Sequence, residues 1–272
     1  MSELYTDERG NPDGLPLVVL HGGPGLDHTM FGSALDPLGD AYRLLLVDER
    51  ATGRSPRGSD PSTWTLEQHA RDLDALGEEL GRYAVLGHSF GAFIALQHAV
   101  DTQHPPAGTI VSAGAPSERW LEHLENTLNT FEPEHLREQV AASWAREQTV
   151  ETEDGVREIL RDQLPFHFAD PEDPRIAELD LSTMRGNPDV LRHGANEGYG
   201  NLDVEARLGD IAHPVLIING AHDRLFAREP AEFMAARIPG AQLAILEHSA
   251  HMGFIEEPEA YLGAVRRFLD GL

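Results

Sequence analysis

One short run constrains the fold of this chain more than any other. An apolar stretch at residues 83–86 ends in Gly-His-Ser-Phe-Gly at positions 87–91, and an almost unbroken apolar pattern of helical type follows. This order of strand, sharp turn and helix is the context in which a G-x-S-x-G motif presents a nucleophilic serine, here Ser89. A serine at such a turn takes strained backbone angles, so the positions two residues away must carry no bulk. The alternative, an ordinary strand–turn–helix with a chance serine, is disfavoured by the flanking pattern.

The composition limits the kinds of protein that the chain can be. It has 272 residues, a formal net charge of −25 and no cysteine. This length suits one large α/β domain or a core domain with an insertion, and the lack of cysteine excludes disulfides and thiol nucleophiles. The negative charge predicts that neither nucleic acid nor an anionic membrane is a partner. No apolar run is long enough to span a membrane and the first residues are polar, so we expect a cytoplasmic protein; its oligomeric state is not predicted.

Short apolar, β-branched runs alternate with helical patterns along most of the chain, which is typical of a doubly wound, mostly parallel sheet. Helical spacing of leucine and alanine predicts a helix over residues 66–80 with Thr65 as its N-cap, and a last helix over 258–269. The predicted strands are residues 16–20, 43–48, 83–86, 108–113, 214–219 and 242–246.

The alternation stops between about residues 116 and 206, where the chain is rich in Glu, Arg and Pro and no strand is predicted. We interpret 116–206 as a helical lid inserted into a core made of 1–115 and 207–272. Three sets of residues fall on helical faces in this segment: Trp120, Leu121, Leu124, Leu128 and Phe131; Leu136, Val140 and Trp144; and Val156, Ile159 and Leu160.

A nucleophilic serine needs a base and an acid that orients the base, and in this fold they follow the serine in the order acid, then histidine. Asp223 follows the predicted strand 214–219 in a tight turn, although a turn Asp that caps a helix is an alternative. Two histidines follow the last predicted strand. His251 is favoured because small residues precede it, and His248 is the alternative. The other histidines are read as structural or surface groups, and no metal or other cofactor is expected.

The oxyanion that forms during acyl transfer needs backbone N–H donors. One donor is expected from Phe90, the residue after the serine, and the other from the His-Gly-Gly-Pro-Gly loop at residues 21–25. Glycines in this loop let the backbone approach a substrate carbonyl, and Gly23 is the predicted donor, with Gly22 beside it as a candidate for substrate contact. A phosphate-binding loop is a weak alternative, because neither known glycine-rich phosphate motif is present.

These segments together resemble the α/β-hydrolases, and within them the proline iminopeptidases and their relatives. The matching pieces are HGGPG at 21–25, DERATGRS at 48–55, GHSFG at 87–91, GAHD at 220–223 and HSAHMGFIEEPE at 248–259. The resemblance implies an α/β-hydrolase fold, an oxyanion hole at HGGPG and a cis bond between Gly23 and Pro24. It also implies that Asp48 and Arg50 pair with each other or with the nearby loop.

The chain departs from that family at several positions. Ala51 stands where the family usually has glycine, from which we expect a turn without positive φ. With His88 and Phe90 on either side of Ser89, the motif at residues 87–91 has a sequence that is also found in esterases and lactonases. A peptidase of this type also needs lid carboxylates for the ammonium of its substrate, and Glu197 is the candidate, with Glu122 and Glu125 in the same acidic insertion.

We therefore expect a serine hydrolase with Ser89, His251 and Asp223, acting on small N-terminal peptides. Hydrolysis of a small ester or lactone is the alternative within the same class. A ligand-binding protein with the same fold and little turnover is the alternative from another class, since a fold does not fix a function.

Overall fold

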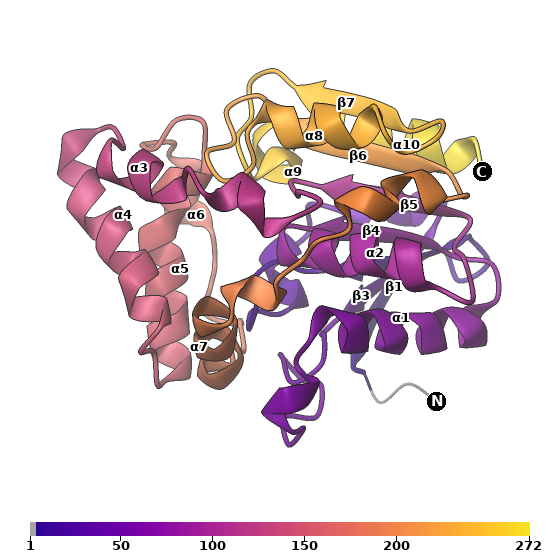
Figure 1. Ribbon diagram of the computed structural model, residues 1–272, viewed down its shortest axis with the longest axis horizontal. Helices are drawn as coiled ribbons and strands as arrows, with labels where there is room; N and C mark the ends of the chain where they lie inside the picture. Colours follow the sequence, from indigo (N-terminus) through magenta and orange to yellow (C-terminus); the bar gives the residue numbers. More distant parts are fainter. Residues whose placement is uncertain (1–3) are drawn as a thin grey trace.

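The computed structural model describes residues 4–272, and one seven-stranded sheet forms its centre (Figure 1). The strand order across the sheet is β1-β3-β2-β4-β5-β6-β7, and every neighbouring pair is parallel except β1 with β3. The strands are β1 Thr6–Gly10, β2 Pro16–Leu20, β3 Arg43–Val47, β4 Ala84–His88, β5 Gly108–Ser112, β6 Val215–Gly220 and β7 Gln242–Leu246. Because β2 to β7 are parallel, their carboxyl ends share one edge, where open α/β sheets hold their ligands.

All six predicted strands are confirmed, with bounds within two residues of the prediction. The strand β1 was not predicted, because Asp7, Glu8 and Arg9 give it a charged, polar sequence. It pairs antiparallel with β3 at the edge of the sheet, where charged side chains reach solvent and discourage pairing with another chain.

Helices cover both faces of the sheet, as a doubly wound fold requires. Leu17 and Leu86 face the core that contains α10 (Pro258–Asp270), whereas Val18 and Val85 face the core that contains α1 (Leu66–Leu80) and α2 (Phe90–Asp101). The helix α8 (Arg228–Ala235) joins the second core, and α9 (Gly253–Glu256) joins the first. The predicted N-cap of α1 is confirmed, since the Thr65 side chain accepts the N–H of Gln68. Within residues 4–272, no helix is both long and apolar enough to cross a membrane.

The segment between β5 and β6 is helical, as predicted, and extends beyond the end of the sheet on the left of Figure 1. Its helices are α3 Leu124–Asn129, α4 Glu134–Glu147, α5 Glu153–His167, α6 Arg175–Glu178 and α7 Pro188–Asn196. Val156, Ile159 and Leu160 on α5 pack into the core on one face of the sheet. Leu136, Val140 and Trp144 on α4 instead form a separate small core with Phe131 and Phe166.

The single helical face predicted from Trp120 to Phe131 is wrong. The chain forms a 3-10 turn at Glu118–Leu121 and a separate helix α3, and Phe131 lies beyond the end of that helix. Trp120 packs against Phe233 of the core, while Leu124 and Leu128 pack with Phe131. The apolar residues therefore serve two different cores, and a break between them lets each reach its own.

Candidate active site

Ser89 lies at the turn between β4 and α2, with a φ of 55°. A positive φ is strained for a residue that carries a side chain, and it persists here because the surrounding backbone holds it. A Cβ at Gly87 would lie 2.1 Å from the carbonyl oxygen of Gly91, and a Cβ at Gly91 would lie 2.5 Å from that of Leu20. The two glycines are thus required by close backbone approach on both sides of the serine.

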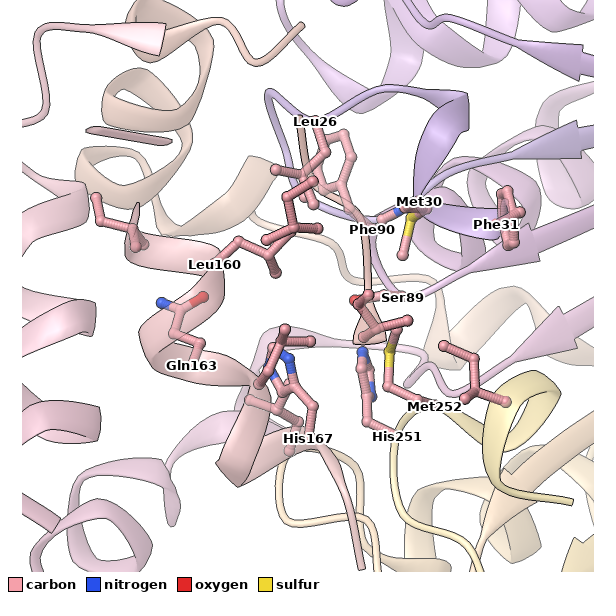
Figure 2. A pocket seen from close by; sticks show the side chains of 18 of the residues that line it. Leu26, Met30, Phe31, Ser89, Phe90, Leu160, Gln163, His167, His251 and Met252 are labelled. Carbon is pink, nitrogen blue, oxygen red and sulfur yellow. The ribbon is translucent and has the colours of Figure 1, made fainter. Parts of the chain in front are cut away.

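His251 and Asp223 are brought together from the loops after β7 and β6. The Nδ1–H of His251 donates to Oδ2 of Asp223 at 2.9 Å, and both side chains are buried. The other carboxylate oxygen of Asp223 accepts the N–H groups of Leu225 and Phe226, at 2.9 and 3.1 Å. The carboxylate is thereby fixed and Nε2 of His251 is left free. Ser89 and His251 line the same cavity, and Figure 2 shows the imidazole pointing toward Ser89.

His248, the alternative base, does not reach this cavity. Its side chain is exposed, and its backbone N–H donates to Glu257 at 2.8 Å. The structure therefore pairs His251, rather than His248, with Asp223.

The loop at residues 21–25 runs beside Ser89. The N–H of Gly91 donates to the carbonyl oxygen of His21 at 2.9 Å, and the N–H of Gly22 donates to the sulfur of Met30 at 2.9 Å. Among residues 4–272, the N–H groups of Gly23 and Phe90 have no hydrogen-bond partner. Gly23 and Phe90, the residues that the sequence analysis selected as oxyanion donors, both line the cavity, and the Gly23–Pro24 bond is cis. Gly22 also lines the cavity, but its N–H is already bound.

The segment 48–55 holds the neighbouring loop in a way that the sequence only partly predicted. Asp48 accepts the backbone N–H groups of His28 and Arg54 at 3.0 and 2.7 Å, so it does pair with the nearby loop. Arg50 instead pairs with Asp72 on α1 at 2.7 Å. The expectation that Ala51 avoids positive φ is wrong: its φ is 61°. Its buried carbonyl accepts the side-chain amide of Asn187 at 2.7 Å, which helps to hold this conformation.

Two further histidines pack against the ring of His251, and the sequence analysis gave neither a role in the site. The ring of His88, the residue before Ser89, is fully buried. Its centroid lies 4.8 Å from that of the His251 ring, and its Nδ1 lies 3.2 Å from the Ser112 hydroxyl. The ring of His167, at the end of α5, lies 5.0 Å from that of His251. Burial lowers the pKa of both His88 and His167 well below its usual value, so both rings are neutral at pH 7.

The cavity over Ser89 has a volume of about 510 Å³ and a largely apolar lining. Loops at the edge of the sheet and helices of the segment between β5 and β6 contribute to it from opposite sides (Figure 2). The principal apolar side chains are Leu26, Met30, Phe31, Phe93, Val156, Ile159, Leu160, Leu164, Leu181, Leu191, Phe226, Met252 and Phe254. Such a cavity is large enough for a substrate with a bulky apolar part.

One buried carboxylate interrupts the apolar lining. Glu147, at the end of α4, is 5% exposed and accepts hydrogen bonds from the Tyr199 hydroxyl at 2.6 Å and from the Gln163 amide at 2.5 Å. Burial raises the pKa of Glu147 above its usual value, although both hydrogen bonds oppose that rise. The sequence analysis missed this residue, because the spacing of α4 alone does not show that it faces α5.

The carboxylates that the sequence analysis selected lie elsewhere. Glu197, Glu122 and Glu125 are all exposed, and none of them lines the cavity. Glu197 was selected for its place in a segment that resembles a family motif, but α7 ends next to it, at Asn196, and its side chain reaches solvent. Glu147 is the buried carboxylate of this helical segment that lines the cavity.

The end of α5 is tied directly to the loops that carry Asp223 and His251. The guanidinium of Arg224 donates to the carbonyl oxygens of Phe166, Phe168 and Ala169 at 3.1, 2.5 and 3.1 Å. The N–H of His251 donates to the intervening carbonyl, that of His167, at 3.0 Å. A cation at the carbonyl end of a helix is also electrostatically favourable.

Glu256 makes a second link between the same two segments. One of its carboxylate oxygens accepts the N–H of Ala169 at 2.7 Å, and the other accepts the N–H of Ala250 at 2.8 Å. The helical segment and the loop before His251 are therefore held in one arrangement.

The helix α7 packs on the loop at residues 21–25. The N–H of Asn187 donates to the carbonyl oxygen of Gly25 at 2.7 Å. A Cβ at Gly194 would lie 2.3 Å from Cγ of Pro24, which shows how closely the helix approaches this loop.

Comparison with known proteins agrees with this architecture. A family model described as alpha/beta hydrolase fold matches residues 16–258. The chain belongs to that family. The expected fold and the expectation of a hydrolase are thereby confirmed.

The chain is similar in sequence to proteins named proline iminopeptidase, and its fold is similar to that of such an enzyme and of an esterase. The chain is 27% identical to a proline iminopeptidase of Saccharolobus solfataricus, and the similarity covers 93% of this chain and 84% of that protein. Its fold is similar to that of a proline iminopeptidase from Mycobacterium smegmatis, with a TM-score of 0.74, 21% identity, and coverage of 98% of this chain and 94% of that one. It is also similar to that of a thermophilic esterase from Thermogutta terrifontis, with a TM-score of 0.75, 24% identity, and coverage of 98% and 93%.

The contact between α7 and Pro24 predicts the effect of a small substitution. Alanine is a better helix former than glycine by about 1 kcal/mol, so Gly194→Ala would stabilise an unpacked helix. Here the added methyl group overlaps Pro24, and overpacking of this kind costs about 1–3 kcal/mol. We expect Gly194→Ala to lower the free energy of unfolding in a denaturant titration.

The matched control is Gly209→Ala, where the nearest atom to an added Cβ lies 4.0 Å away. Equal unfolding free energies for the two variants would show that α7 does not press on the loop at residues 21–25.

Proposed function

We propose that the chain is a serine hydrolase in which Ser89, His251 and Asp223 form the catalytic triad. The observation that carries this proposal is that Ser89 and an Asp223-bound His251 face one cavity, beside two unbound N–H groups. The helical segment 116–206 acts in this proposal as a lid, because its helices form the far wall of that cavity.

The reaction follows from these positions. Oγ of Ser89 attacks the substrate carbonyl carbon while Nε2 of His251 takes the hydroxyl proton, and Asp223 stabilises the resulting imidazolium. The N–H groups of Gly23 and Phe90 bind the oxyanion. The bond to the leaving group breaks as His251 gives the proton to the leaving atom. Water, deprotonated by His251, then attacks the acyl group on Ser89, and the released serine oxygen regains its proton.

For the substrate, we propose an acyl group with a free amine, as at the N-terminus of a short peptide. Relatives of this chain that are named proline iminopeptidase support this class. Glu147 supplies a buried carboxylate that an ammonium can neutralise, and the exposed Glu178 and Asp180 lie at the same cavity. The strong negative charge of the chain also favours the approach of a cationic substrate.

Hydrolysis of a small ester or lactone is the second candidate. It is favoured by the largely apolar lining, and Glu147 already has two hydrogen-bond donors without a substrate. A binding protein with little turnover would show neither activity.

The triad predicts which substitutions abolish hydrolysis. Ser89→Ala and His251→Ala should each lower kcat by roughly 10³-fold or more, because the nucleophile and base act as one unit. The loss of Ser89 should also abolish labelling by a fluorophosphonate probe, measured by mass spectrometry of the labelled peptide. His248→Ala is the matched control and should keep most of the activity, because its side chain is exposed and outside the cavity. Labelling that persists in Ser89→Ala would place the nucleophile elsewhere.

The amine-binding role of Glu147 predicts a substrate-dependent loss. Glu147→Gln should raise KM for a prolyl- or alanyl-arylamide and lower kcat/KM by roughly 10- to 150-fold, the usual effect of losing a charge-assisted contact. A p-nitrophenyl ester without an amine should be almost unaffected, and Glu197→Gln should change neither substrate. N-acetylation of the arylamide should have the same effect as Glu147→Gln.

The same residue gives a pH dependence with a defined sign. An ammonium requires the ionised carboxylate, and burial raises the pKa of Glu147, so amine binding is lost as the pH falls through that raised value. We expect kcat/KM to fall more steeply with acid for the amine substrate than for the ester, and this difference should vanish in Glu147→Gln. Equal cleavage of blocked and free substrates would favour the esterase alternative.

A further inference from the structure

The side chain of His167 has no role in the mechanism above, yet it lines the cavity next to the proposed base. It is 8% exposed, and among residues 4–272 its ring nitrogens have no hydrogen-bond partner. Figure 2 shows it beside His251, on the lid side of the cavity. These nitrogens are accessible from the cavity rather than enclosed in the protein interior, so a substrate can form hydrogen bonds with them.

The position of this ring is closely determined. It packs edge-on against Trp144, with ring centroids 5.7 Å apart, and against His251 at 5.0 Å. Arg224 holds the carbonyl groups on either side of it, and the His167 carbonyl accepts the N–H of His251. The ring is therefore presented to the cavity in a fixed orientation, as a recognition group must be.

A neutral ring offers one donor and one acceptor. Burial lowers the pKa of His167 well below its usual value, and the neighbouring His251 and Arg224 act in the same direction. The imidazole therefore keeps one N–H and one lone pair at neutral pH. It can bind an amide carbonyl or an amide N–H of a substrate without carrying a charge that would oppose protonation of His251.

Its place next to His251 indicates which part of a substrate it meets. His251 must pass its proton to the leaving atom, so the leaving group lies against His251 during the reaction. Gln163, one helical turn earlier on the same face of α5, continues the polar surface toward Glu147. Most other residues that line the cavity are apolar. His167, whose ring packs against that of His251, is therefore the polar side chain of the lid that a leaving group beside His251 would meet.

We propose that His167 contacts the substrate and determines specificity, by hydrogen-bonding a polar leaving group such as the amino-terminal amide of the departing peptide. This inference rests on the serine hydrolase proposed above. It assigns the selection of the leaving group to the lid, separately from the amine recognition assigned to Glu147.

The test compares two leaving groups on one acyl group. Wild type, His167→Phe and His167→Gln are assayed with an alanyl dipeptide amide, whose leaving group carries amides, and with alanyl β-naphthylamide, whose leaving group is apolar. Phe keeps the ring that packs on Trp144 and His251 but removes both polar atoms, while Gln keeps a donor and an acceptor. We expect His167→Phe to lower kcat/KM for the dipeptide amide by roughly 10-fold and for the naphthylamide by less than about 3-fold. His167→Gln should recover most of the loss.

A second measurement separates contact with substrate from support of His251. The rate of Ser89 labelling by a small fluorophosphonate, which lacks a peptide-like leaving group, should be nearly the same in wild type and His167→Phe. Equal losses for both amides, or a matching loss of labelling, would mean that His167 acts only by positioning His251. No loss with either substrate would also overturn the proposal.

Failure of the proposed function would look different. If only esters are hydrolysed, the same comparison is made with glycolamide and phenyl esters of one acyl group, and the ratio between them decides the role of His167. If Ser89→Ala remains active, the triad itself is wrong, whatever the His167 variants show.

Discussion

The close approach of the backbone after β2 to the turn at Ser89 is the constraint on which the rest of the site depends. The hydrogen bond from the N–H of Gly91 to the carbonyl of His21 joins the start of α2 to the loop that holds Gly23. A side chain at Gly91 would separate these segments, because its Cβ would overlap the backbone of Leu20 and His21, and a Cβ at Gly87 would overlap the backbone of Gly91 at the start of α2. The strands β2, β4 and β5 lie side by side and are almost completely buried, so the contact has a rigid base. Ser89 and the N–H groups of Gly23 and Phe90 are consequently held in one fixed arrangement.

The helical segment between β5 and β6 is part of the site and not only a cover over it. Its helix α5 ends in carbonyl groups that accept hydrogen bonds from Arg224 and from the N–H of His251, and α7 rests on Pro24. The loop at residues 21–25 and the His251–Asp223 pair therefore both contact this helical segment. Glu147 and His167, for which we propose contacts with a substrate, are thereby held in fixed positions relative to the proposed triad. The same links mean that a substitution in the lid can alter catalysis without touching the substrate.

The three residues of the proposed triad could be selected from sequence, because each belongs to a short local signal. Ser89 lies in a strand–turn–helix, and Asp223 and His251 follow strands whose carboxyl ends share one edge of the sheet. Glu147 and His167 could not be found in this way, because their places at the cavity arise from the pairing of α4 with α5 and from the docking of the end of α5 on the core. Glu197 was selected because a short segment around it resembles a family motif, but its side chain is exposed to solvent in the folded protein. Ala51 shows the same limit, since a buried carbonyl bound by Asn187 overrides the usual preference of alanine for negative φ.

A crystal structure of the protein after reaction with an alanyl diphenyl phosphonate would test the central claim most directly. The account predicts a covalent bond between phosphorus and Oγ of Ser89, with a phosphonyl oxygen within hydrogen-bond distance of the N–H groups of Gly23 and Phe90 and Nε2 of His251 close to Oγ. Attachment to another residue, or a phosphonyl oxygen directed away from both N–H groups, would contradict it.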